Sequence, residues 1–189
     1  KRDVARMINK IKLSLILLII ATAQSNALIE VDITRGNLDP LPIAVSPLSA
    51  EKETEDNLTK ELKEENIGQK ISEVVENNLK NSGLFNPLNK DAFLQKPDIA
   101  HLKPRFEDWS LIKAQALITG KVTLVNEKLR VEFRLWDVLA GKEMMALAFT
   151  TVPSNWRRVG HIITDKVYER LTGEKGYFDT RIIYVAEEG

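Results

Sequence analysis

The domain organisation of this chain is most evident in WRRVGHIITDKVYERLTGEKGYFDTRIIY, residues 156–184. Five large apolar side chains recur here every three or four residues, a spacing that places them on one face of a helix: Trp156, Val159, Ile163, Val167 and Leu171. Ser154 or Asn155 is suited to cap the start of this helix, and Gly173 to end it in the left-handed conformation. A loop over residues 174–179 and a new strand from Arg181 follow, so we expect a completed domain followed by another element.

Strand patterns precede this helix. Five short or alternating apolar runs predict strands: residues 42–47, 84–88, 115–125, 129–136 and 145–149. The last three are joined by short turns, which predicts an antiparallel meander in which Gly120 marks a bulge or close packing. Residues 67–82 form a second amphipathic helix. We therefore expect an α+β two-layer domain, with a mixed or antiparallel sheet of about five strands and two main helices on one face.

Two connecting regions carry weaker patterns. Residues 49–65 are rich in Glu and Lys, which predicts a solvated loop or a frayed helix, with an acidic docking surface as the alternative. Residues 89–104 predict irregular structure before a short helix within residues 105–114. Four apolar side chains are expected to anchor the irregular part: Phe93, Leu94, Ile99 and Leu102.

The N-terminus has the pattern of a secretory signal peptide. Met7 is followed by Lys10 and Lys12, then by an apolar run over residues 13–21, and Ser25-Asn26-Ala27 offers small residues for cleavage. The apolar run is short for a membrane-spanning helix, which needs about 20 residues. An uncleaved anchor is the alternative to a signal that ends at residue 27.

Charge and cysteine content argue against several classes of function. Formal net charge is zero, but residues 1–27 are basic, so the remainder is mildly acidic. Nucleic-acid binding needs clustered Lys and Arg, so this balance argues against it. Because the sequence contains no cysteine, it offers no disulfide, thiolate metal site or cysteine nucleophile.

The candidate catalytic residues do not form a convincing group. His101 and His161 have no second metal ligand at a suitable spacing, and His161 with Asp165 predicts a helix-surface pair. The adjacent acids at residues 107–108 and 187–188 point apart in a helix or a strand, so neither pair predicts an acid–base site. We expect no enzyme activity, no cofactor and no metal.

Two segments near the C-terminus have residues that could bind an anion. The loop over residues 171–176 follows a helix and therefore does not present amides at a helix N-terminus, which excludes a phosphate cradle. Arg157 and Arg158 beside Trp156 predict a solvated basic helix start, with a stacked anion site as the less favoured alternative.

Protein binding is the remaining prediction. Residues 28–34 follow directly after the expected cleavage point and alternate apolar and polar side chains from Ile29 onward, and a glycine-containing linker follows. A terminal strand at a sheet edge can detach and pair with the edge of another protein. An ordinary first strand is the alternative.

Several segments together resemble the TolB family, the periplasmic component of the Tol–Pal system of Gram-negative bacteria. The resemblance rests on residues 43–45, 79–88, 115–122 and 171–182. It implies a signal peptide (residues 1–27), a partner-binding strand and linker (28–39), an α/β domain shaped like the anticodon-binding domain of class II aminoacyl-tRNA synthetases (40–176) and the start of a β-propeller (177–189).

The resemblance also implies partners. The matching N-terminal segment of the family binds the C-terminal domain of the inner-membrane protein TolA, and Pal of the outer membrane binds mainly the propeller. Carried over residue by residue, the TolA-binding positions are Leu28, Ile29, Glu30, Val31, Asp32, Ile33, Thr34, Arg35, Gly36, Leu38 and Asp39. The chain would thus serve envelope integrity and cell division. The alternative is a periplasmic domain that docks onto a cell-wall enzyme through its helices and residues 49–65.

Overall fold

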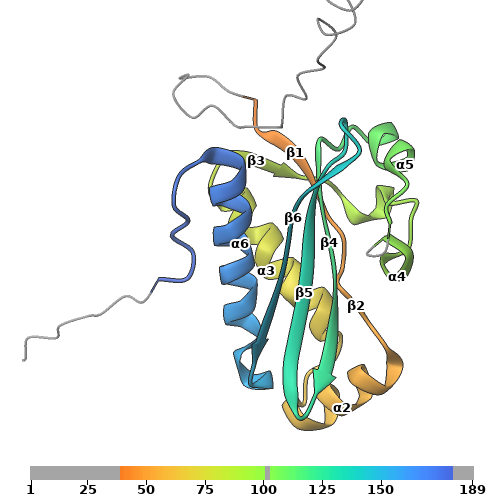
Figure 1. Ribbon diagram of the computed structural model, residues 1–189, viewed down its shortest axis with the longest axis vertical. Helices are drawn as coiled ribbons and strands as arrows, with labels where there is room; N and C mark the ends of the chain where they lie inside the picture. The colour runs from red at the N-terminus through yellow and green to blue at the C-terminus, as the bar shows by residue number, and fades with distance from the viewer. Residues whose placement is uncertain (1–38, 101–102, 181–189) are drawn as a thin grey trace, which may run out of the picture.

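A six-stranded mixed sheet carries two long helices on one face in the computed structural model (Figure 1). The structure describes residues 39–100 and 103–180, apart from the side chains of residues 99 and 100. The strands are β1 (Leu41–Val45), β2 (Ser49–Ala50), β3 (Phe85–Pro87), β4 (Ala116–Val125), β5 (Lys128–Asp137) and β6 (Lys142–Thr151). The helices are α2 (Lys52–Leu62), α3 (Ile67–Asn81), α4 (Pro97–Ala100), α5 (Phe106–Leu111) and α6 (Trp156–Thr172), with 3-10 turns at Lys90–Ala92 and Pro153–Asn155. The predicted α+β class is confirmed.

The sheet combines parallel and antiparallel pairs. Its order is β3-β1-β4-β5-β6, with β2 also paired to β4. Strand β1 runs parallel to both β3 and β4, whereas β4, β5 and β6 form the predicted antiparallel meander. The turn between β4 and β5 has positive φ at both Asn126 (50°) and Glu127 (59°), as a two-residue primed turn requires. The expected strand at residues 28–34 lies outside the described residues.

The main core lies between the sheet and the helices α3 and α6. Fully buried side chains from α3, the sheet and α6 meet there, for example Ile71, Phe133 and Ile163. The two helices approach closely at Gly160, where an added Cβ would lie 2.7 Å from Cγ1 of Val74. At Gly120 an added Cβ would lie 2.2 Å from the carbonyl oxygen of Glu132, so close packing explains this glycine.

A second, smaller core covers part of the opposite face of the sheet. Helix α5 places Trp109 there, against Leu117 and Trp136. Alternation along β5 places Trp136 on the face away from the main core, as observed, but the side chain is only 9% exposed there. Its indole Nε1 donates to Oγ1 of Thr119 at 2.9 Å, and its ring meets Phe106 edge-on at 5.8 Å.

The polar region after β1 is more regular than expected. Residues 52–62 form the eleven-residue helix α2, and Leu58 on it is 0% exposed, so the prediction of a loop or frayed helix is wrong. A carboxylate oxygen of Glu55 also accepts a hydrogen bond from the backbone N–H of Ile67 at 3.1 Å, which ties α2 to the start of α3. The prediction of α3 itself is confirmed.

Two smaller predictions are corrected. Leu94 was expected to anchor the segment before α5, but it is 62% exposed, whereas Phe93 packs on Trp109 with ring centroids 5.0 Å apart. Asn155 makes no capping hydrogen bond at α6, because its amide instead donates to Oγ1 of Thr151 at 3.1 Å. The predicted left-handed end of α6 at Gly173 is confirmed, with φ of 76°.

Candidate interaction site

The predicted partner-binding segment meets the described domain at β1. Ten of its eleven residues lie outside the described residues, and the eleventh, Asp39, is exposed. Two residues later the N–H of Leu41 donates to the carbonyl oxygen of Leu84 at 2.9 Å, and β1 begins between β3 and β4. Every strand pair of the described sheet falls between Leu41 and Thr151. Removal of residues 28–38 would therefore leave all of these pairs in place.

The titratable residues singled out from the sequence have structural partners. Nδ1 of His161 lies 2.9 Å from Nδ2 of Asn78 on α3, rather than against Asp165. Asp108 pairs with Arg105, while His101 and the acids at 187–188 lie outside the described residues. Among the described residues, no three His, Cys, Asp or Glu side chains are placed to hold a metal ion. The helices in this part of the chain also include none with the length and hydropathy of a membrane span.

The two arginines at the start of α6 have separate contacts. The guanidinium of Arg157 lies over the Trp156 ring, 4.7 Å from its centroid. Arg158 pairs with both carboxylate oxygens of Asp179, with Nε 3.0 and 3.2 Å from Oδ1 and Oδ2, and Nη2 3.0 Å from Oδ2. The hydrogen bonds to Asp179 raise the pKa of Arg158. Arg157 thus stacks on the Trp156 ring, whereas Arg158 holds a later part of the chain.

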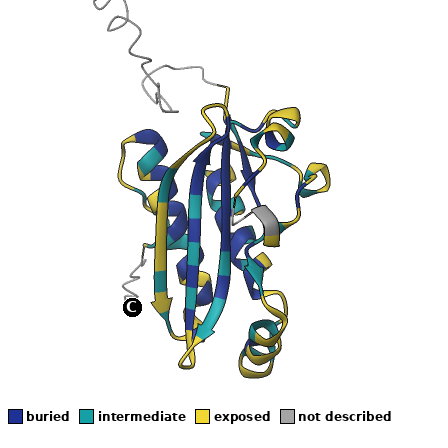
Figure 2. Cartoon of the chain, turned by 45° about the vertical axis from the view of Figure 1, so that its right-hand side comes forward, coloured by how far each residue is buried: buried dark blue, intermediate teal, exposed yellow. Residues whose placement is uncertain are grey.

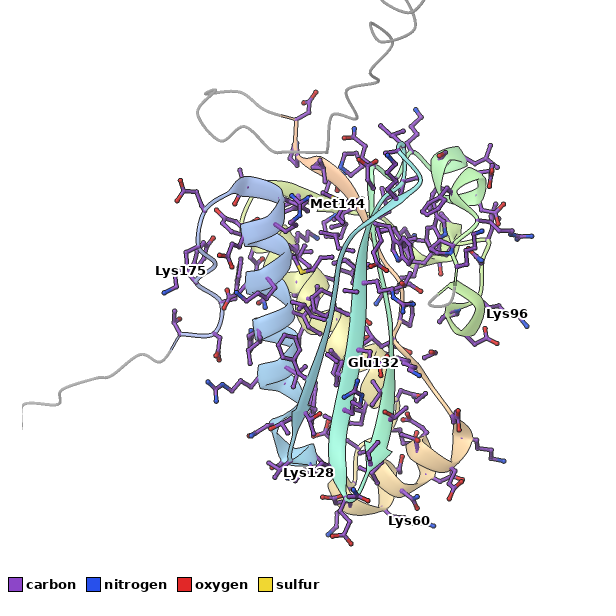
Figure 3. The ribbon with its side chains drawn as sticks, in the orientation of Figure 1. Lys60, Lys96, Lys128, Glu132, Met144 and Lys175 are labelled. Atoms are coloured by element: carbon purple, nitrogen blue, oxygen red, sulfur yellow. The ribbon has the colours of Figure 1, made fainter. Side chains whose placement is uncertain are left out.

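That later part is the loop over residues 174–180, which returns along α6. The carboxylate of Asp165 accepts the backbone N–H of Phe178 at 2.7 Å through Oδ1 and that of Asp179 at 3.1 Å through Oδ2. Gly176 lies so close that an added Cβ would be 2.4 Å from Cα of Asp165. Figure 3 shows Lys175 on the side of this loop that faces away from α6. The loop is therefore fixed to the helix through its backbone.

Aromatic packing strengthens the same attachment. The ring of Tyr168 on α6 meets Tyr177 at 5.6 Å and Phe178 at 5.7 Å, both edge-on. Tyr177 and Phe178 also stack on each other at 4.5 Å. Burial raises the pKa of Tyr168, with further contributions from Tyr177 and Glu174. We call Asp165, Arg158, Tyr168 and the loop that they hold the α6 clamp.

The other notable feature is the open edge of the sheet at β6. This strand ends the sheet order, and most of its residues are exposed or half-buried (Figure 2). Leu147 near its middle is 39% exposed. On the side away from α6, Glu132 of β5 lies among basic side chains. A hydrogen bond from Arg130 lowers its pKa against the opposing effect of burial, and Lys121 and Arg134 lower it further. Figure 3 shows Glu132 on this face of the central strands.

Neither the α6 clamp nor the β6 edge was predicted from the sequence. The pattern that signals the edge is weak, because Ala146 and Ala148 are short apolar residues that also fit a buried strand. Asp165 gave no signal beyond its place on a helix. The described residues thus define an α+β domain whose notable features are a backbone clamp and an open strand edge.

Comparison with known proteins identifies the family. The family model described as the TolB amino-terminal domain matches residues 29–144. The Tol-Pal system protein TolB of Pelagibacter ubique (strain HTCC1062) is 79% identical over 174 residues, which cover 92% of this chain and 39% of that protein. The chain belongs to the TolB family, and it spans well under half the length of this curated relative.

Solved structures agree with the fold. TolB from Acinetobacter baumannii matches with a TM-score of 0.59 at 20% identity, over 80% of this chain and 33% of that chain. The LpoB C-terminal domain from Salmonella enterica matches with a TM-score of 0.42 at 11% identity, over 71% of this chain and 93% of that chain. The first match supports a shared fold, and the second is too weak to support one.

Proposed function

We propose that this chain is the exported N-terminal part of a periplasmic TolB-like protein that connects TolA of the inner membrane with Pal of the outer membrane. The observation that carries this proposal is the 79% identity to the Tol-Pal system protein TolB of P. ubique. Through these two contacts the protein supports envelope integrity and cell division.

The contact with TolA is assigned to residues 28–39. Their alternating pattern suits a strand that is added to the sheet of another protein, where backbone hydrogen bonds provide affinity and alternate side chains provide specificity. The exposed Asp39 and the entry of the chain at β1 support this assignment, because the described strand pairs do not depend on the segment. The contact with Pal is assigned to the propeller that the family resemblance places after this domain.

A binding experiment tests the TolA assignment. The processed chain, beginning at residue 28, is compared with a chain that lacks residues 28–36 for binding to the purified C-terminal domain of TolA. We expect the deletion to weaken binding at least about tenfold, while the urea midpoint stays the same because the core begins at Leu41. Equal binding by the two chains would rule out the segment as the TolA site.

The rival, docking onto a cell-wall enzyme through α2, needs a separate variant. Glu53 and Glu61 both lie exposed on α2, and changing both to Lys reverses part of the acidic surface of this helix. We expect TolA binding to change less than about twofold, because exposed charges far from a contact contribute little. A large loss of TolA binding with this variant, and none with the deletion, would place the TolA contact on α2 instead of residues 28–36.

Export is tested independently of binding. Expression of the full chain in a Gram-negative host followed by fractionation should yield a periplasmic product whose N-terminal residue is Leu28. Mass spectrometry distinguishes this product from an uncleaved anchor, which would stay with the membrane and retain residues 1–27.

A further inference from the structure

A further surface is formed by described residues other than 28–39. It consists of the free edge of β6 with the groove between β6 and α6 on one side and the basic face of β5 on the other. We propose that this edge accepts an extended, acidic segment of a partner protein as an added strand, with alternating apolar and acidic side chains.

The backbone of β6 is available along most of its length. The strand has ten residues and lies at the end of the sheet order, so its outer N–H and C=O groups have no strand partner within the described residues. The register with β5 shifts between Leu135 and Trp136, and near this irregularity Nε of Arg170 donates to the carbonyl oxygen of Met144 at 3.4 Å. The open part of the edge is therefore residues 145–151.

The face of β6 toward α6 presents apolar side chains of β6 beside charged side chains of α6. Leu147, which pairs with Phe133 of β5, and Met145 line a depression of about 500 Å³ together with Lys166, Glu169, Arg170 and Gly173. A second depression of about 180 Å³ follows at Phe149, where Ile162 contributes apolar surface beside Asn155 and Arg158. Alternate side chains of an added strand point to this face, so branched apolar residues would cover the exposed part of Leu147.

The opposite face suits carboxylates. Arg134 and Glu132 lie directly across from Ala146 and Ala148, and Arg130 lies across from Thr150. The shallow depression over these residues, about 200 Å³, is lined by three cationic side chains and one carboxylate: Lys121, Arg130, Arg134 and Glu132. The side chains of Arg130 and Arg134 remain 42% and 39% exposed in their ion pairs with Glu132 and Glu143.

The alanines determine how a partner would reach these arginines. An added strand would lie two strand spacings from β5, about 10 Å away. Because Ala146 and Ala148 carry only methyl groups, a glutamate on the added strand and an arginine on β5 can meet above them. Because Arg130 pairs with Glu132 and Arg134 with Glu143, this face, with Lys121, carries a small excess of positive charge. A second copy of this chain would bring two such basic faces together, so charge complementarity favours an acidic partner over self-pairing.

Three synthetic octapeptides, acetylated and amidated, test the proposal. The first alternates valine and glutamate, the second alternates valine and lysine, and the third places four valines before four glutamates. We expect only the first to bind the processed chain saturably, since only it presents apolar and acidic side chains on opposite faces. Backbone amide NMR should place its shifts at residues 145–151 and along the facing side of α6.

Variants locate the effect. Arg130→Glu combined with Arg134→Glu should weaken binding of the valine–glutamate peptide at least about tenfold. The matched control, Lys80→Glu with Lys175→Glu, makes the same change in net charge at exposed sites on other elements and should change affinity less than about twofold. If the double arginine variant fails to fold, Leu147→Asp decides, because it replaces the exposed apolar side chain on which the valines would pack and should also abolish binding.

Several outcomes would overturn the proposal: equal binding of the three peptides, no saturation by about 1 mM peptide, equal effects of the two charge variants, or dimerisation of the chain through β6. The chain lacking residues 28–36 should bind the peptide as well as the processed chain does. Failure of the TolA experiment would therefore not contradict the proposal for β6, and failure of the peptide experiment would not contradict the TolA assignment.

Discussion

Replacing Asp165 by alanine should release the loop over residues 174–180 from α6. The carboxylate accepts two backbone N–H groups, those of Phe178 and Asp179, at 2.7 and 3.1 Å. A hydrogen bond to a charged group contributes about 1.5–3 kcal/mol, but these amides are only partly buried and regain water once the loop detaches. The packing of Tyr177 and Phe178 on Tyr168 remains. We therefore expect the free energy of loop attachment to fall by about 2 kcal/mol.

Hydrogen exchange of the Phe178 amide measures this change directly. A loss of about 2 kcal/mol corresponds to about thirtyfold faster exchange when the loop opens locally. Asp165→Asn keeps one oxygen that can accept one of the two bonds, so we expect about 1 kcal/mol and about fivefold faster exchange. The control is Glu169→Gln, which removes a carboxylate of the same helix that pairs with Lys166 at the exposed surface.

The control should change exchange at Phe178 by less than about twofold, because exposed ion pairs contribute little. The reasoning would be refuted if Asp165→Ala and Glu169→Gln gave the same rate for the Phe178 amide. The same conclusion would follow if the alanine variant lowered global stability while that amide stayed fully protected, since the carboxylate would then act on the core instead of the loop.

Three further changes test the core and its titration. Gly160→Ala should lower the free energy of unfolding, measured in urea, by about 1–3 kcal/mol, because the new methyl group would lie 2.7 and 2.8 Å from Cγ1 and Cβ of Val74. Leu58→Ala should cost about 2–5 kcal/mol, whereas Leu94→Ala should cost less than about 0.5 kcal/mol in the same assay, because the two side chains are 0% and 62% exposed. Burial raises the pKa of Tyr168, so the folded state keeps this proton where the unfolded state has lost it, and stability should fall as pH rises above about 10; Tyr168→Phe should flatten that fall in urea midpoints measured between pH 8 and about 11.

The strands and the closing helix could be predicted because one periodic pattern determines each. Along β5, alternate residues from Leu129 to Leu135 fill the main core, as the sequence indicates. The same rule does not predict that Trp136 is buried, because α5 covers the opposite face of the sheet at this residue. Alternation in a strand predicts which of its faces is buried. It does not predict that the other face is also covered, as α5 does here from about 25 positions earlier in the sequence.

Helix α2 was underestimated for a related reason. Its sequence offers Leu58 and Leu62 among many charged residues, too few apolar side chains to indicate a stable helix in isolation. Burial of Leu58 in the main core and the bond from Ile67 to Glu55 provide the missing stabilisation. The α6 clamp is less predictable still, because a carboxylate that accepts backbone N–H groups requires no particular residue types in the loop that it holds.

Helix α6 contributes to both the clamp and the proposed strand-binding groove, which raises the question of whether the two are coupled. Arg158 lines the groove near Phe149 and also pairs with Asp179, whereas Asp165 contacts only the loop among the hydrogen bonds described. Coupling needs two sites that bias the same equilibrium, and a helix packed on α3 along its length provides no second position. Asp165→Ala should therefore leave the affinity for the valine–glutamate peptide within about twofold, whereas Arg158→Ala should alter both peptide binding and Phe178 exchange. A tenfold change in peptide affinity with Asp165→Ala would mean that the loop, once released, competes for the groove or that α6 itself moves.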